Sequence, residues 1–168
     1  DKGWRTEHQK GIALSALSIS FAVMQTLNAT AILLVHPLGY RMEAARRDIS
    51  RITNIMPPIG LISIAAYLEQ QDIRASILDC YAHPDSDARI REILLALKPA
   101  FVGFTSTTSS FLDALRLTQM AKALLPGIQS VFGGPHISAL KARVLEVYPD
   151  VDFAVVGEGE ETLRDLIL

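Results

Sequence analysis

From Ala31 onward, short apolar runs alternate with longer amphipathic stretches in a regular order. The short runs are almost continuously hydrophobic, as strands are when both faces of a parallel sheet are covered. The stretches between them have apolar residues at helical spacing and are bounded by Pro, Ser and Gly. We therefore predict strands over 31–37, 74–81, 100–108, 129–134 and 151–160, and helices over 57–71, 87–99, 109–127, most of 137–149, and 160–168.

This alternation predicts an α/β fold. Right-handed crossovers between consecutive parallel strands favour a doubly wound, flavodoxin-like (Rossmann-like) five-stranded parallel sheet with strand order 2-1-3-4-5. In such sheets a ligand binds outside the carboxyl ends of the strands. The residues that follow each predicted strand are therefore the first candidates for a binding site.

The loops after the third, fourth and fifth predicted strands are small, polar or rich in glycine. Three neighbouring loops without bulk are typical of a groove in which the backbone approaches a large ligand. Hydroxyl groups offer donors and acceptors without charge, which suits a mostly neutral ligand. The candidate binding residues are Pro37, Leu38 and Gly39, then Thr105, Ser106, Thr107 and Thr108, then Gly133, Gly134, Pro135 and His136, and finally Gly157, Glu158 and Gly159.

The two glycines of the stretch VFGGPH, Gly133 and Gly134, leave two explanations open. A ligand could lie against the backbone there, or a close turn between strand and helix could need glycine. His136, two residues later, is predicted to fix its loop through a hydrogen bond rather than to act as an acid or base. Glu158, Glu160 and Glu161 are interpreted as acidic residues at a helix N-terminus, where the helix dipole stabilises them, with a pair of acid/base carboxylates as the alternative.

Composition narrows the class of protein. The chain has 168 residues, 49% of them hydrophobic and 20% charged, as in a globular domain with a real core. The net charge of −2 gives no basic surface for nucleic acid. The single cysteine, Cys80, cannot form an internal disulfide or an iron–sulfur site, and it fits a cytoplasmic setting.

Residues 1–30 are set apart from the regular pattern. No Asp, Glu, Lys or Arg occurs from Gly11 to Tyr40, and the run from Gly11 to Leu27 is apolar but interrupted by Ser, Gln and Thr. An amphipathic helix is the first interpretation, and a targeting segment, a marginal membrane helix or an extension foreign to the domain are the alternatives. A membrane partner is not expected.

Several stretches resemble a known family in the same order along the chain. They are LLVHPLGYR, PPIGLISIAAYLEQQ, KPAFVGFTSTTSSFLDALRLTQMAKALLP, VFGGPHIS and DFAVVGEGEETLRDLI. Together they resemble the amino-terminal cobalamin (vitamin B12)-binding domain of cobalamin-dependent radical S-adenosylmethionine (SAM) enzymes, which include methyltransferases and the anaerobic ring cyclase of bacteriochlorophyll synthesis. The resemblance covers residues 31–168.

The resemblance implies a cofactor and a division of the parent protein. Cobalamin would be held at the carboxyl edge of the sheet, with its nucleotide tail near the loops 105–108 and 133–135. A downstream radical SAM domain of the parent chain would carry the 4Fe-4S cluster, S-adenosylmethionine and the chemistry. The fragment alone is not expected to be catalytic, because a single cysteine cannot supply the family's cluster motif.

His36 is the candidate cobalt ligand. Many cobalamin-binding domains outside the radical family have the motif D-x-H-x-x-G, and here His36 and Gly39 match its second half. Leu34 stands where the acidic residue would orient the imidazole. On that ground we expect His36 not to ligate cobalt. Because the tail would extend between the loops after the third and fourth strands, away from the corrin, we also expect the cofactor's own base to be displaced from cobalt.

Two other functions share this topology. A receiver-like signalling domain needs acidic residues at the ends of the first and third strands, where this chain has His36-Pro37 and Thr105-Ser106. A nucleotide-binding domain would show a glycine fingerprint after the first strand, where only Gly39 occurs. Both alternatives are weaker than cobalamin binding.

Overall fold

A computed structural model of the chain describes residues 31–39, 57–83 and 85–168, so the predictions for residues 1–30 lie outside it. The described residues form a five-stranded sheet in which every neighbouring pair is parallel. The order β2-β1-β3-β4-β5 confirms the predicted flavodoxin-like topology. The strands are β1 (Ile32–His36), β2 (Ala75–Asp79), β3 (Phe101–Thr105), β4 (Gln129–Gly133) and β5 (Phe153–Ala154).

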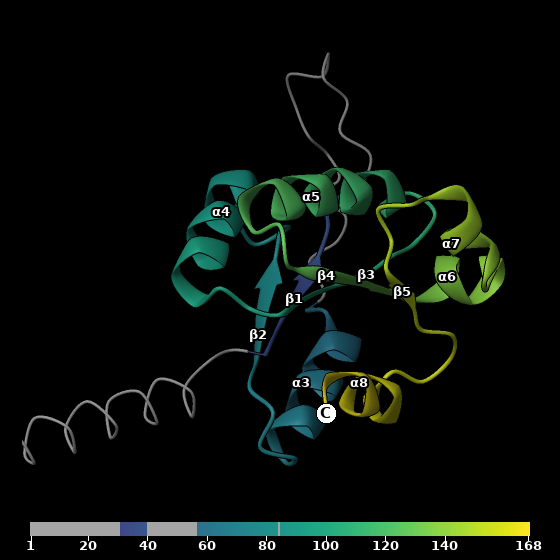
Figure 1. Cartoon of the computed structure of the whole chain (residues 1–168), viewed down its shortest axis with the longest axis horizontal. Helices are drawn as coiled ribbons and strands as arrows, with labels where there is room; N and C mark the ends of the chain where they lie inside the picture. Colours follow the sequence, from purple (N-terminus) through teal and green to yellow (C-terminus); the bar gives the residue numbers. More distant parts are fainter. Residues whose placement is uncertain (1–30, 40–56, 84) are drawn as a thin grey trace, which may run out of the picture.

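Helices cover both faces of the sheet (Figure 1). On one face lie α3 (Ile59–Glu69) and α8 (Glu160–Ile167), and on the other α4 (Ser86–Leu97) and α5 (Phe111–Leu124). Two short helices, α6 (Pro135–Leu140) and α7 (Arg143–Val147), lie at the β5 end of the sheet. Among the described residues, no helix combines the length and hydrophobicity needed to cross a membrane.

The continuous apolar sequence of β1 follows from this double cover. Successive side chains of a strand point to opposite faces, so Ile32 and Leu34 join the core under α3 and α8. Leu33 and Val35 join the core under α4 and α5. All four side chains are at most 1% exposed, which leaves no room for a polar side chain at these four positions.

Two predicted elements differ from the structure. The helix predicted over 137–149 is divided into α6 and α7, because Lys141 between them has φ 53° and leaves the helical conformation. The strand predicted over 151–160 is regular only at Phe153–Ala154, although the Val155 amide still donates to the Phe132 carbonyl at 2.8 Å. Beyond it the chain turns away at Gly157, whose φ is 82°. The residues after β5 therefore form a loop that leads to α8, instead of continuing the strand.

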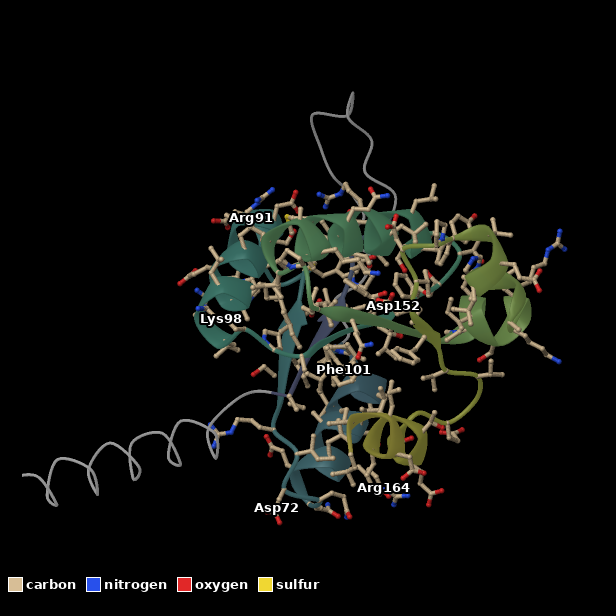
Figure 2. All side chains as sticks on the ribbon, in the orientation of Figure 1. Asp72, Arg91, Lys98, Phe101, Asp152 and Arg164 are labelled. Carbon is tan, nitrogen blue, oxygen red and sulfur yellow. The ribbon has the colours of Figure 1, made fainter. Side chains whose placement is uncertain are left out.

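Asp152 fastens the short strand β5 to its neighbours (Figure 2). Its carboxylate accepts hydrogen bonds from the amide and hydroxyl of Ser130, at 2.7 and 3.0 Å, and from Lys122 Nζ at 2.8 Å. Ser130 is completely buried. Burial raises the pKa of Asp152, but the hydrogen bonds from Lys122 and Ser130 outweigh burial and leave that pKa below its usual value of 3.8.

We expect Asp152→Ala to lower the free energy of unfolding by about 1–3 kcal/mol at neutral pH, because the buried Ser130 amide loses its acceptor. A depressed carboxylate pKa stabilises the fold above the unfolded-state pKa, and that contribution is lost as pH falls through the lower folded-state pKa. The difference from wild type should therefore shrink below about pH 4. Urea unfolding at several pH values measures it, and a difference that grows on acidification would contradict the assignment.

Candidate functional site

A cavity of about 190 Å³ lies on the α3/α8 side of the sheet, at the carboxyl ends of the central strands. Strands β1, β3 and β4 form its floor, and α3 and α8 form its walls. The loop between β5 and α8 completes the rim. The residues that line the cavity are Leu34, Gly60, Leu61, Ile64, Gly103, Phe104, Thr105, Val131, Gly133, Gly134, Val155, Gly157, Glu158, Gly159, Glu160 and Leu163.

The floor of the cavity is set by the register of the strands. Leu34, Gly103 and Val131 are paired in register across β1, β3 and β4 and form one row. Thr105 and Gly133 form the next row toward the carboxyl edge. Small residues in the row nearer the edge leave the cavity open there, while the row behind it is hydrocarbon.

Space remains beside two of the lining glycines. A Cβ atom built on Gly133 would meet only the Val155 carbonyl oxygen, at 4.0 Å, and one built on Gly60 would meet nothing within 4 Å. Gly60 lies in the first turn of α3, where glycine is less favourable than alanine. Packing of the described residues does not require glycine at either position, which is what a site kept clear for a ligand would show.

Gly134 has a different reason to be glycine. Its φ of 95° with ψ of −177° is accessible essentially to glycine alone. An added Cβ would lie 2.9 Å from both the amide nitrogen and the carbonyl oxygen of Ser106. The close turn therefore explains glycine at 134, whereas Gly133 has open space beside it and the packing of the described residues does not explain its glycine.

The two wall helices are tied together by polar pairs. Ser63 Oγ on α3 donates to Glu160 Oε1 on α8 at 3.0 Å, next to the cavity. One turn further along, Arg164 Nη1 donates to the Tyr67 hydroxyl at 2.7 Å (Figure 2 labels Arg164). Glu160 and Glu161 occupy the first turn of α8, as predicted from the helix dipole. These contacts fix the width of the cavity between α3 and α8.

Some of the predicted binding residues line the cavity and the others do not. Of those in the loops after β3, β4 and β5, the ones that line the cavity are Thr105, Gly133, Gly134, Gly157, Glu158 and Gly159. Ser106 lies beneath them, almost fully buried, and its amide and hydroxyl donate to the Gly133 carbonyl at 2.9 and 3.2 Å. The others, which are outside the cavity lining, are Pro37, Leu38, Gly39, Thr107, Thr108, Pro135 and His136.

His136 connects two of the loops, as predicted. Its Nδ1 lies 3.2 Å from Thr108 Oγ1, and its ring packs on Phe111 with the ring centres 4.5 Å apart. The His136 amide donates to the Ser106 carbonyl at 3.1 Å. Since these contacts join the loop after β3 to the start of α6, His136 holds the rim of the site in place.

His36 has an orienting carboxylate, contrary to the argument from Leu34. Asp79, its partner in register on β2, places Oδ1 3.1 Å from His36 Nδ1. A carboxylate can only accept, so Nδ1 donates in this pair, which leaves Nε2 as the ring nitrogen that could ligate a metal. No described residue forms a hydrogen bond with Nε2. The sequence argument looked for the acidic residue on the same strand, whereas the parallel sheet supplies it from the neighbouring one.

The loop after His36 is held by side chains from other elements. The Leu38 amide donates to Asp113 Oδ2 on α5 at 3.1 Å, and the Gly39 amide donates to the Tyr81 hydroxyl at 2.7 Å. The Tyr81 ring also packs against the His36 ring, with centres 5.0 Å apart. Within residues 37–39, the part of this loop that the structure describes, no amide is free for a ligand, and these residues hold His36 at the carboxyl edge.

Sequence reasoning missed the residues of the floor and walls. Two of them had a recognisable signal, because Gly60 interrupts a predicted helix and Gly103 interrupts a predicted strand, both at otherwise apolar positions. The aliphatic residues had none, since a core residue and a cavity-lining residue have the same pattern. They are Leu34, Leu61, Ile64, Val131, Val155 and Leu163.

Comparison of the sequence with known protein families identifies the family of this chain. The sequence matches the B12 binding domain family over residues 47–167, which is most of the chain. The chain belongs to this family. The cavity at the carboxyl ends of β3 and β4 therefore lies within a chain of the B12 binding domain family.

Curated relatives of this B12-binding domain are longer enzymes. An uncharacterised methyltransferase of Pyrococcus horikoshii is 33% identical over 66% of this chain and 24% of its own length. The anaerobic magnesium-protoporphyrin IX monomethyl ester cyclase of Rubrivivax gelatinosus is 32% identical over 81% of this chain and 24% of its own. The cobalamin-dependent radical SAM methyltransferase TokK of Streptomyces tokunonensis is 25% identical over 68% and 17% respectively. The matched region thus spans about a quarter or less of these relatives.

Proposed function

We propose that this B12-binding domain holds cobalamin at the carboxyl edge of its sheet, with the nucleotide tail in the cavity between the sheet, α3 and α8. The observation that carries the proposal is the open space at Gly133 and Gly60, two positions where the packing of the described residues would accept a side chain. The cavity is at the strand ends where doubly wound sheets bind ligands. Thr105 and the loop 157–159 would contact the tail at the rim.

The residues present fit the cofactor in chemistry as well as in shape. Aliphatic walls suit an aromatic base, and the Thr105 hydroxyl at the mouth is a donor and acceptor that no described residue uses. Bound cobalamin would supply a redox-active cobalt centre to the larger protein. We propose that this protein is a radical SAM methyltransferase or oxidative cyclase, whose other domain holds the 4Fe-4S cluster and S-adenosylmethionine.

The purified chain is expected to retain hydroxocobalamin in equilibrium dialysis, and to retain cobinamide, which lacks the nucleotide tail, much more weakly. Circular dichroism establishes that the sample is folded. A folded sample that retains neither corrinoid would refute the proposal. Equal retention of both would refute the placement of the tail in the cavity.

His36 is the proposed cobalt ligand. Asp79 pairs with Nδ1 and orients the imidazole, so ligation through Nε2 would cost less side-chain entropy than it would for an unrestrained histidine. A tail held in the cavity keeps the cofactor's own base away from cobalt. From Leu34 we expected His36 to leave cobalt unligated. We now propose instead that His36 ligates cobalt.

Electron paramagnetic resonance of the cob(II)alamin-loaded domain tests this assignment. We expect a nitrogen superhyperfine splitting that changes when the protein is uniformly labelled with nitrogen-15 and disappears in His36→Ala. Asp79→Ala should weaken it, because the ring loses its partner on Nδ1. A splitting that is indifferent to protein labelling would come from the cofactor's base, and a spectrum without splitting would mean that no nitrogen ligates cobalt.

A further inference from the structure

The floor of the cavity contains almost no polar group that a ligand could reach. Leu34 Cδ2 lies 2.9 Å and Ile32 Cδ1 3.3 Å from the position of a Cβ on Gly103, so aliphatic carbons cover that residue. The strand pairing of β3 with β1 and β4 engages the backbone at this level of the sheet. A group inserted to this depth therefore meets hydrocarbon.

Polar atoms gather instead at the mouth. Thr105 is one pleat closer to the carboxyl edge than Gly103, and Glu158 and Glu160 belong to the loop and helix at the rim. The Gly133 carbonyl already accepts from Ser106, and Glu160 already accepts from Ser63. The cavity thus has a polar entrance and an apolar interior.

The cavity has the volume to admit an aromatic group. An engineered cavity of about 150 Å³ lined by aliphatic and aromatic side chains admits benzene and stays dry. At about 190 Å³, with a similar lining and an open mouth, this cavity is larger than that reference.

From this arrangement we propose that the cavity selects among corrinoids by the polarity of the lower base, favouring dimethylbenzimidazole over adenine. The inference rests on the proposed function, since it requires the tail to enter the cavity. Adenine carries an exocyclic amino group and additional ring nitrogens, which would lose their water and find no partner along Leu34, Gly103 and Val131. Dimethylbenzimidazole places two methyl groups there instead, which gain from burial.

Equilibrium dialysis with three corrinoids tests the selection: hydroxocobalamin, its analogue with adenine as lower base, and cobinamide without a nucleotide. One unpaired buried polar group typically weakens binding about tenfold or more, so we expect at least this difference between the first two. Equal retention of both bases, or tighter binding of the adenine form, with cobinamide weaker than either, overturns the selection and leaves the proposed function standing. Failure of all three, or cobinamide binding as tightly as hydroxocobalamin, overturns the proposed placement itself.

A pair of valine substitutions separates selection from general destabilisation. Val131→Thr puts a hydroxyl into the floor with little change of shape and should reduce the preference for dimethylbenzimidazole several-fold. Val102→Thr makes the same change at a buried position of β3 on the opposite face, outside the cavity lining. It should lower stability without altering the preference. An unchanged preference in a folded Val131→Thr, or an equal change in Val102→Thr, contradicts the proposal.

Discussion

Gly134→Val is expected to unfold the domain or to destabilise it by at least about 3 kcal/mol, whether or not a ligand is present. The backbone at φ 95° and ψ −177° costs a residue with a side chain about 1–3 kcal/mol. The new Cβ would also meet the Ser106 amide and carbonyl at 2.9 Å. Those Ser106 groups hydrogen-bond to Gly133 and His136, so the loop cannot move aside without breaking these contacts.

Urea or thermal unfolding of the variant measures this loss. Gly127→Val is a suitable control, because a Cβ on Gly127 meets nothing within 4 Å and its φ is not positive. The control should remain close to wild type in stability. A Gly134→Val protein as stable as the control would show that the loop after β3 can relax, and the structural requirement for glycine would be withdrawn.

Gly133→Val, one residue earlier, is expected to leave the domain folded and to weaken cobalamin binding at least tenfold. Its Cβ faces open space apart from the Val155 carbonyl at 4.0 Å, and β-branched residues suit a strand. The added carbons would occupy volume at the mouth of the cavity, where the nucleotide tail must pass. Substitution of Gly134 should thus reduce stability, whereas the same substitution of Gly133 should reduce binding.

Dialysis against hydroxocobalamin, paired with an unfolding curve for each protein, checks the contrast. Gly60→Ala extends it to the facing wall: it should raise the stability of α3 slightly, by up to about 1 kcal/mol, while reducing retention of the cofactor. Gly127→Val again controls for a glycine outside the cavity. Normal cobalamin retention by a folded Gly133→Val would refute the role of this cavity in binding.

The sequence alone was sufficient for the fold class and the strand order. Nearly continuous apolar strands alternating with amphipathic helices can bury both faces only as a covered parallel sheet, and crossover handedness then limits the topology. The sequence also located the glycine-rich and hydroxyl-rich loops at the strand ends, because these loops are local in sequence. Six of the residues it named, among them Thr105 and Gly133, line the cavity.

Only the tertiary structure decided what each of those residues does. Gly133 and Gly134 are identical in sequence, but only Gly134 lies so close to the Ser106 backbone that a side chain could not be added. The carboxylate that orients His36 is 43 residues away on β2, where no pattern within one strand could reveal it. The walls of the cavity come from α3 and α8, at distant positions along the chain, and apolar periodicity is the same whether a side chain faces a core or an open cavity. Local pattern determines the elements, whereas contacts between residues distant in sequence determine the site.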